Sequence, residues 1–357
     1  MRLARIELQH FRGFHEAVFD LRHPDGDPLP VVALVGPNGS GKSSVLAAIS
    51  GALTTMQPRY GGVLLGRGDV LRTSDDAPAS VTLHVADTRD GLPTGFVVQV
   101  VSSLGEWSIP DPEMEYALWR TTIADDAPSP VGLAIAFDAH RLLPPLEVRG
   151  INDNLETATA RGNALAPSLR RDQTMWFRFA QLEQWIVNLD HRRARAKADR
   201  GEAFPLWDLL VQGLDEILAP VRFEGVDERF TVRFATPTGS VPLSALSDGF
   251  RSVFVIVSEL LLRLSLASDD PYAALDLPAL CLIDEIDAHL HPRWQSQIVR
   301  GLQRLFPKVQ FVVTTHSPFV VASLQPHEIF RLGDIDPAVL APVDTATRFS
   351  FNEPIAR

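Results

Sequence analysis

Cysteine is almost absent from this chain of 357 residues, which contains only Cys281. A single cysteine excludes an internal disulfide bond and is typical of a protein from a reducing compartment. Apolar runs of about eighteen residues, the length that a membrane-spanning helix needs, are also absent. The first residues alternate apolar and polar side chains and lack the unbroken apolar stretch of a signal peptide. We therefore expect a cytoplasmic protein with no membrane partner.

An excess of positive charge is missing too, because the formal net charge is −11. This balance argues against a surface that is basic throughout, but it leaves a local basic groove open. Hydrophobic residues make up 45% and charged residues 22% of the chain, as in ordinary globular proteins. A solvated helix face is the favoured interpretation of two basic clusters, and a DNA-binding groove is the alternative. The clusters are Arg170, Arg171 and Arg178, and then Arg192, Arg193, Arg195, Lys197 and Arg200.

Residues 1–150 carry strand patterns on both sides of one helix pattern, and we expect them to form an N-terminal lobe. Alternating side chains predict strands over 2–11 and 17–21, joined by a turn. The wholly apolar run over 31–35 is typical of a buried parallel strand, and residues 43–53 have helical composition. Further strands are expected over 81–85, 96–101 and 131–137, and this segment is expected to form an antiparallel sheet with loops.

Residues 151–220 have a helical pattern instead. Apolar side chains recur at steps of three and four residues and predict one buried helix face. These side chains are Met175, Phe179, Leu182, Ile186 and Leu189. A second helix is expected over 206–218, ended by Pro220. Sustained heptads are absent, so a compact helical insert is favoured over a long coiled-coil arm.

Residues 221–357 return to strands and form the expected C-terminal lobe. The pattern predicts strands over 222–223 and 230–234, a helix over 248–267, and buried strands over 277–283 and 309–314. Residues 334–357 are rich in proline and too few for a further catalytic domain. Together the three segments predict an α/β fold with a mixed central sheet, N-terminal antiparallel strands and the helical insert.

Residues 36–43 read G-P-N-G-S-G-K-S and match the P-loop pattern G-x-x-x-x-G-K-[ST] between a predicted strand and a predicted helix. Glycines let backbone N–H groups turn toward phosphate oxygens, and the helix N-terminus adds partial positive charge. Lys42 is expected to reach the β- and γ-phosphates of ATP as a catalytic residue, and the Ser43 hydroxyl to ligate Mg²⁺. The predicted ATP-binding residues of the loop are Gly36, Pro37, Asn38, Gly39, Ser40, Gly41, Lys42, Ser43 and Ser44.

Two carboxylates, Asp284 and Glu285, end the apolar run L-C-L-I. The carboxyl end of a strand in an open α/β sheet faces the ligand crevice, and a P-loop requires a partner carboxylate. We expect Asp284 to hold Mg²⁺ and Glu285 to orient and deprotonate the attacking water. A helix cap is the simpler alternative for this pair.

Residues 246–252 read L-S-D-G-F-R-S and open the helix predicted over 248–267. The Ser247 hydroxyl can cap this helix, and Gly249 permits a close approach of the backbone to phosphate. Both are therefore candidate ATP-binding residues. Ser-Asp-Gly begins many helices, so the motif gains weight from its place after the P-loop and before the two carboxylates.

Three histidines follow these motifs. His316 comes directly after the last buried strand, in T-T-H-S-P. His289 and His291 form an H-x-H pair, which can bind Zn²⁺ where alternate residues of a strand share a face. No third or fourth ligand with suitable spacing stands out, so zinc binding is disfavoured.

The four motifs, spread from Gly36 to His316, resemble in kind and order those of ABC-type ATPases of the SMC, RecF and OLD (overcoming-lysogenization-defect) group. The opening F-R-G-F is similar to the start of RecF-like proteins. The segments LSDGFRS, IDEIDAHLHPRWQ and TTHSP most closely resemble bacterial ATPases of anti-phage systems, including Septu-like and retron-linked ones. This resemblance implies ATP and Mg²⁺ as cofactors, contact of His316 with the γ-phosphate and the attacking water, and a separate effector such as a nuclease as partner.

The resemblance also implies a homodimer, or a higher homo-oligomer, in which two head-to-tail subunits enclose ATP. One subunit would supply the P-loop, the two carboxylates and His316, and the other would supply Ser247 and Gly249. Residues 286–292 occupy the place of the D-loop, which implies contact across the dimer. Two features depart from the family pattern. Gln99 is a poor candidate for the Q-loop glutamine, with residues 138–141 as the alternative, and the nuclease domain of OLD proteins is missing.

Three functions are open on the sequence alone. The favoured one is an ATP-driven sensor or regulator of an effector in anti-phage defence. The alternatives are a DNA repair or recombination ATPase of the RecF and SMC kind, and a slow ATPase whose ATP-bound dimer acts mainly as a scaffold. A transporter ATPase is disfavoured, because the residues after Glu285 lack the usual P-T-S-A-L-D pattern and the insert is large.

Overall fold

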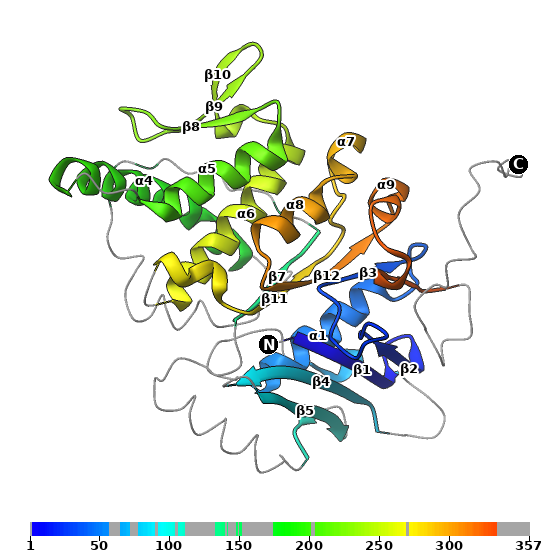
Figure 1. Cartoon of the computed structure of the whole chain (residues 1–357). Helices are drawn as coiled ribbons and strands as arrows, with labels where there is room; N and C mark the ends of the chain where they lie inside the picture. Colours follow the sequence, from blue (N-terminus) through cyan, green and yellow to red (C-terminus); the bar gives the residue numbers. More distant parts are fainter. Residues whose placement is uncertain are drawn as a thin grey trace, which may run out of the picture.

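The computed structural model describes residues 2–56, 65–71, 78–89, 92–103, 106–110, 133–139, 141, 148, 150–151, 174–200, 204–268 and 271–333. Several sequence predictions therefore lie outside the described residues, namely those on 152–173, His140 and 334–357. In Figure 1 the described part has two large sheets with one helix between them and a group of helices on the far side of the second sheet.

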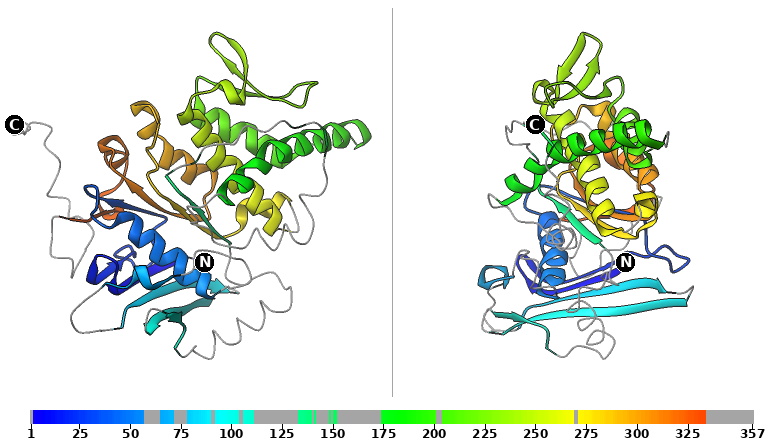
Figure 2. Two further views of the ribbon diagram at one scale, coloured as in Figure 1. Left: turned by 180° about the vertical axis from the view of Figure 1, so that it is seen from behind. Right: turned by 90° about the vertical axis from the view of Figure 1, so that its left-hand side faces the viewer.

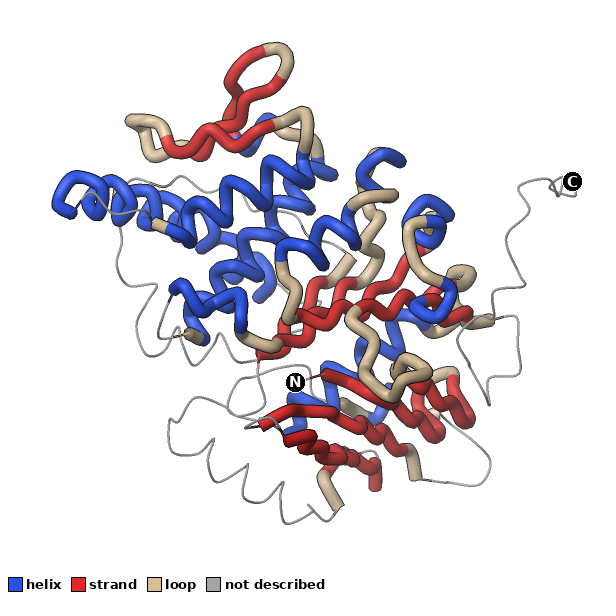
Figure 3. The backbone as a smooth tube through the Cα atoms, in the orientation of Figure 1, coloured by secondary structure: helices blue, strands red, loops and turns tan. Residues whose placement is uncertain are grey.

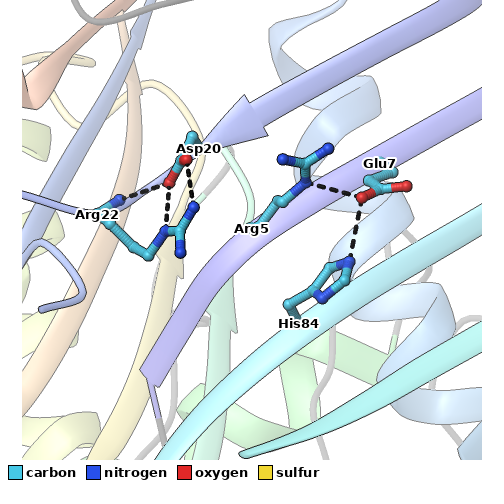
Figure 4. A network of polar contacts seen from close by, with 5 residues as sticks. All are labelled: Arg5, Glu7, Asp20, Arg22 and His84. Atoms are coloured by element: carbon cyan, nitrogen blue, oxygen red, sulfur yellow. Dashed lines mark hydrogen bonds and ion pairs between the residues drawn. The ribbon is translucent and has the colours of Figure 1, made fainter. Parts of the chain in front are cut away.

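The first sheet is antiparallel and contains the N-terminal strands. Its strand order is β2-β1-β4-β5-β6. The strands are β1 (Arg2–Phe11), β2 (Phe14–Asp20), β4 (Ser80–Arg89), β5 (Leu92–Ser103) and β6 (Glu106–Ser108). Polar contacts lie along β1, β2 and β4, where Glu7 accepts a hydrogen bond of 2.7 Å from Arg5 and lies 3.1 Å from His84 (Figure 4). A hydrogen bond from Arg22 lowers the pKa of the neighbouring Asp20.

The second sheet is parallel and lies at the centre of the molecule. Its strand order is β13-β3-β12-β11-β7, and every pairing is parallel. The strands are β3 (Val31–Val35), β7 (Leu133–Phe137), β11 (Ala279–Ile283), β12 (Val309–Thr315) and β13 (Ile329–Arg331). Both faces of this sheet are buried, so its strands read as continuous apolar runs.

Helix α1 (Lys42–Met56) fills the space between the two sheets (Figure 2). It shares a core with the antiparallel sheet and with one face of the parallel sheet, including Leu280 and Leu282 of β11. The alternate residues of that strand, Cys281 and Ile283, belong to a second core on the opposite face. The P-loop helix is therefore held from both sides.

Helices cover the other face of the parallel sheet (Figure 3). They are α4 (Thr174–Arg200), α5 (Pro205–Leu218), α6 (Asp248–Ala267) and α8 (Ile298–Leu305), with the short helices α7 (Pro292–Gln295) and α9 (Pro318–Ala322). Helix α5 begins with proline, which suits the first turn, and buries one apolar stripe against α6 and α8. A small antiparallel sheet of β8 (Arg222–Val226), β9 (Val232–Thr236) and β10 (Gly239–Pro242) lies beyond α5.

The predicted α/β fold class is confirmed. The antiparallel and parallel strands form separate sheets rather than one mixed sheet, because α1 separates them. The strand expected over 131–137 in an antiparallel sheet is instead β7, which pairs in parallel with β11. Within the predicted helical insert, Leu182, Ile186 and Leu189 are buried as expected, while the side chains of Met175 and Phe179 lie outside the described part. Among the helices that the structure describes, none combines the length and the apolar character needed to cross a bilayer.

Glu183 on α4 provides a pH-dependent prediction of stability. Burial raises the pKa of its carboxyl group to about 7 from 4.5. Because the folded pKa is raised, the folded state is favoured below about pH 4.5 and loses this contribution as pH rises through about 7. We expect Glu183→Gln to raise the free energy of unfolding by about 1–3 kcal/mol at pH 8.5 and to change little at pH 4.5. Urea unfolding at both pH values measures this difference. The exposed Glu16→Gln is the control, and equal effects at both pH values would contradict the prediction.

Candidate functional site

The P-loop joins β3 to α1 and encloses the side chain of Lys42. This side chain is 6% exposed, and its Nζ donates to the carbonyls of Gly36 and Pro37 at 2.8 Å each. Burial lowers the pKa of Lys42, while the carboxylates of the site oppose that shift. The ammonium group therefore lies folded back onto the loop, within the reach of phosphates bound at the loop's N–H groups.

Two loop glycines are required by close packing. A Cβ on Gly36 would lie 2.2 Å from the carbonyl oxygen of Leu332, beside β13. Gly41 has a φ of +96°, and a Cβ there would lie 2.5 Å from the ring of Phe14. Phe14 belongs to the N-terminal F-R-G-F segment, so this segment packs against the loop at Gly41. Its role was missed from the sequence, because its partner is distant along the chain.

Asp284 follows β11 and meets the P-loop helix. Its Oδ1 accepts hydrogen bonds from Ser43 Oγ at 3.0 Å and from Thr314 Oγ1 at 2.6 Å. Adjacent ligands of an octahedral Mg²⁺ ion, with bonds of about 2.1 Å, lie about 3.0 Å apart. Ser43 and Asp284 are hard oxygen donors at that separation, so the two predicted ligands fit Mg²⁺.

Glu285 has an unusual backbone. Its φ is +46°, in the left-handed region that non-glycine residues adopt only where the surroundings hold them. Its N–H donates to Thr314 Oγ1 at 2.7 Å, and its side chain is half-buried. Thr314 thus contacts the carboxylate of Asp284 and the backbone of Glu285. The motif T-T-H-S-P was noticed for its histidine alone, although its first threonine makes these contacts.

His316 follows β12, the strand between the P-loop strand β3 and the carboxylate strand β11. The carboxyl ends of these parallel strands share one edge of the sheet, so the P-loop, the carboxylates and His316 lie along it. His316 is exposed, and its neighbours are tightly fixed. Thr315 donates to Asp287 at 2.5 Å, and Ser317 donates to Gln295 at 2.6 Å.

The signature-like residues lie at the start of α6. Ser247 is the N-cap, but its side chain makes no capping hydrogen bond, so the predicted capping role is wrong. The Ser247 carbonyl accepts the first backbone hydrogen bond of the helix, from Arg251 N–H at 3.1 Å. Within the described residues, no hydrogen bond joins Ser247 or Gly249 to the P-loop.

Gly249 is buried against the segment that follows the carboxylates. A Cβ at this position would lie 2.4 Å from the carbonyl oxygen of His289. Ser247, by contrast, is exposed and lines a groove of about 570 Å³. The groove is also lined by Pro220, His289, His291, Arg293 and Trp294. The start of α6 is therefore an outward-facing surface joined closely to residues 289–294.

Two family models match parts of the chain. One AAA domain model, described as "putative AbiEii toxin, Type IV TA system", matches residues 172–322, and a second AAA domain model matches residues 5–101. Septu protein PtuA of Bacillus mycoides (strain KBAB4) is 24% identical over 92% of this chain and 40% of that protein. The "Retron Ec83 probable ATPase" of Escherichia coli is 38% identical over 26% of this chain and 17% of that protein. The chain thus spans less than half the length of these relatives.

Among solved structures, the SMC head domain from Thermotoga maritima aligns with 97% of this chain and 100% of its own length. The TM-score is 0.51 and the identity is 16%, a likeness that shows the fold. These findings agree with one another. The SMC-head fold, the AAA models and the Septu and retron relatives are all expected for a chain that carries the four motifs in this order. Together these matches support a P-loop ATPase of SMC, RecF and OLD-like type.

The protein has a buried arginine, Arg141, beneath its carboxylate motif. Its side chain is 2% exposed and donates to the carbonyls of Asp284 at 2.5 Å and Glu285 at 2.8 Å. Burial lowers its pKa to about 10, against the opposing effect of Asp284 and other carboxylates, so it is charged at neutral pH. Gln99 lies inside β5, opposite Thr82, and not at the edge of the parallel sheet.

His289 and His291 do not lie in a strand. His289 has a φ of +62° in a turn, and His291 is the N-cap of α7, where its Nδ1 accepts from Arg293 N–H at 3.3 Å. The premise of a shared strand face therefore does not hold. Over the described ranges, His, Cys, Asp and Glu side chains form no group of three suited to a metal ion.

The second basic cluster lies along α4. Arg193 is paired with Asp190 at 2.7 Å and lies over the ring of Trp207, with 4.5 Å from its guanidinium carbon to the ring centre. It therefore links α4 to α5. Arg195 and Lys197 are exposed. Arg170 and Arg171, and the side chains of Arg178 and Arg200, lie outside the described part.

Proposed function

We propose that this protein binds ATP with Mg²⁺ and hydrolyses it, and that two copies close head-to-tail on two nucleotides. The separation of the site into two surfaces carries this proposal. The P-loop, Asp284 and Glu285 gather at one edge of the parallel sheet, whereas Ser247 lies exposed on α6 with no hydrogen bond to the P-loop among the described residues. A second copy can bring its α6 to the first copy's nucleotide.

Each group has a defined task in this proposal. The P-loop N–H groups and Lys42 bind the phosphates, and His316 contacts the γ-phosphate. Ser43 and Asp284 would hold Mg²⁺, which neutralises charge on the phosphates when bound. Glu285 accepts a proton from the water that attacks the γ-phosphorus atom, and ADP leaves as the bond to the γ-phosphate breaks. Loss of the γ-phosphate then weakens the contact between the two copies.

We further propose that this cycle controls a separate effector protein, such as a nuclease, in cytoplasmic anti-phage defence. Similarity to a Septu protein and to a retron ATPase supports this context. Residues 151–220 are the proposed output region between the two lobes. Its helices α4 and α5 pack on α6, so a movement of α6 can reach them directly.

Light scattering tests the proposed dimer. Glu285→Gln should bind ATP without consuming it, and its molar mass should double when ATP and Mg²⁺ are added. ADP is the matched control and should leave the mass unchanged. A mass that stays monomeric with ATP would refute the ATP-dependent dimer, and a dimer already present without nucleotide would place the contact on another surface.

A further inference from the structure

Arg141 connects the carboxylate motif to α6. Its Nε donates to Ser252 Oγ on α6 at 2.9 Å. Its Nη1 donates to the carbonyls of Asp138 at 2.8 Å and Asp284 at 2.5 Å, and its Nη2 donates to the carbonyl of Glu285 at 2.8 Å. These bonds use four of the five N–H groups that a guanidinium offers. The side chain therefore bridges three parts of the fold.

The bonds fix the peptide groups on both sides of Glu285. The carbonyl of Asp284 belongs to the preceding peptide group, and the carbonyl of Glu285 to the following one. Thr314 holds the preceding group as well, through the N–H of Glu285. A left-handed φ of +46° persists in a glutamate only where neighbouring contacts impose it. Arg141 supplies such contacts from the planar fork that only arginine has.

The other end of the connection lies near the start of α6. Ser252 is 4% exposed and follows Gly249 by one helical turn. Gly249 itself packs against the carbonyl of His289. The first turns of α6 are therefore linked to the segment after β11 at two places, directly at Gly249 and through Arg141 at Ser252. This helix begins with the residues proposed to meet the partner's nucleotide.

We infer that Arg141 is a positioning residue that sets the backbone of Glu285 and couples it, through Ser252, to the position of α6. The inference rests on the proposed function, since it assigns a route between two ATP sites. The Glu285 of one copy serves the ATP on its own P-loop, whereas its α6 contacts the ATP of the other copy. When the other copy's ATP contacts α6, Arg141 then positions Glu285 to hydrolyse the ATP on its own P-loop.

Two substitutions test this route. Ser252→Ala removes the hydroxyl acceptor and keeps the guanidinium, whereas Arg141→Lys keeps the charge but cannot span the same acceptors. Each is expected to lower kcat about tenfold, the effect of one lost hydrogen bond to a charged group. Affinity for a fluorescent ATP analogue should stay within about twofold, because neither residue belongs to the P-loop. The double variant should be no slower than the slower single variant, since both act in one connection.

Ser258→Ala is the matched control. Ser258 is a buried serine of the same helix whose hydroxyl has no hydrogen-bond partner among the described residues. It should keep wild-type kcat. Should Arg141→Lys fail to fold, as its thermal unfolding would reveal, Ser252→Ala carries the test alone.

The outcomes separate the inference from the proposed function. Wild-type kcat in Ser252→Ala, an equal loss in Ser258→Ala, or a loss of ATP affinity without a loss of kcat would each overturn the positioning role alone. Wild-type protein that does not hydrolyse ATP would overturn the proposed function, and the inference with it. A lower kcat at unchanged affinity, confined to Ser252→Ala and Arg141→Lys, supports the coupling.

Discussion

Glu285→Gln is expected to lower the rate of ATP hydrolysis by about 10²–10⁴-fold, with ATP affinity close to that of the wild type. The substitution keeps the shape of the side chain and removes its ability to accept a proton. The P-loop and the Ser43–Asp284 pair, which would bind the nucleotide and its metal, keep their own contacts. The effect should therefore fall on kcat. Release of phosphate at saturating ATP measures kcat, and direct titration of the nucleotide measures its affinity.

Glu228→Gln is the control for this prediction. It makes the same chemical change in an exposed residue of the turn between β8 and β9, away from the edge of the parallel sheet. A kcat within about threefold of wild type in Glu285→Gln would mean that another group accepts the proton, since removal of a general base costs at least about a hundredfold. The role given to Glu285 would then be wrong.

Gly249→Ala is expected to weaken the ATP-dependent dimer by about a hundredfold. The new Cβ would lie 2.4 Å from a backbone oxygen, that of His289, so either α6 or the segment at 289–290 must shift. Overpacking of this kind costs about 1–3 kcal/mol. In a two-fold symmetric dimer the distortion is present at both sites, so its effect on association counts twice.

The dimer constant can be measured in the Glu285→Gln background by sedimentation in the presence of ATP and Mg²⁺. Gly68→Ala is the control, because Gly68 is exposed and a Cβ there would meet no atom within 4 Å. Thermal unfolding of both variants separates a local shift from a general loss of stability. Unchanged dimerisation in Gly249→Ala would argue that the start of α6 does not lie in the interface.

The sequence predicted the features that depend on local patterns. The P-loop, the β11 carboxylates and the helix over 248–267 were placed within two residues of their observed bounds, because buried strands and glycine turns leave contiguous marks. The contacts of Thr314 and Arg141 could not be predicted. Thr314 is 30 residues from Asp284 and Arg141 is 143 residues away, so their meeting depends on β12 and β7 lying on either side of β11.

Gly249 illustrates a second limit of sequence reasoning. A glycine after Ser-Asp was interpreted as room for phosphate, which stays a prediction, and the sequence did not reveal that a backbone carbonyl of the same chain also packs against it. Ser247 was expected to cap α6 because serine favours that position, yet its hydroxyl makes no capping hydrogen bond and the residue is exposed. Residue type alone does not separate a local hydrogen bond from a side chain left available to a partner.

The two walls of the P-loop come from opposite ends of the described chain. Phe14 packs under Gly41, and the carbonyl of Leu332 lies against Gly36, with Leu332 N–H bonded to Val35 at 2.7 Å. During synthesis the β1–β2 hairpin emerges before the loop and can form early from near neighbours in sequence. The other wall emerges almost 300 residues after the loop. A nascent chain therefore lacks this wall of its phosphate-binding loop until β13 has been synthesised and has joined the parallel sheet.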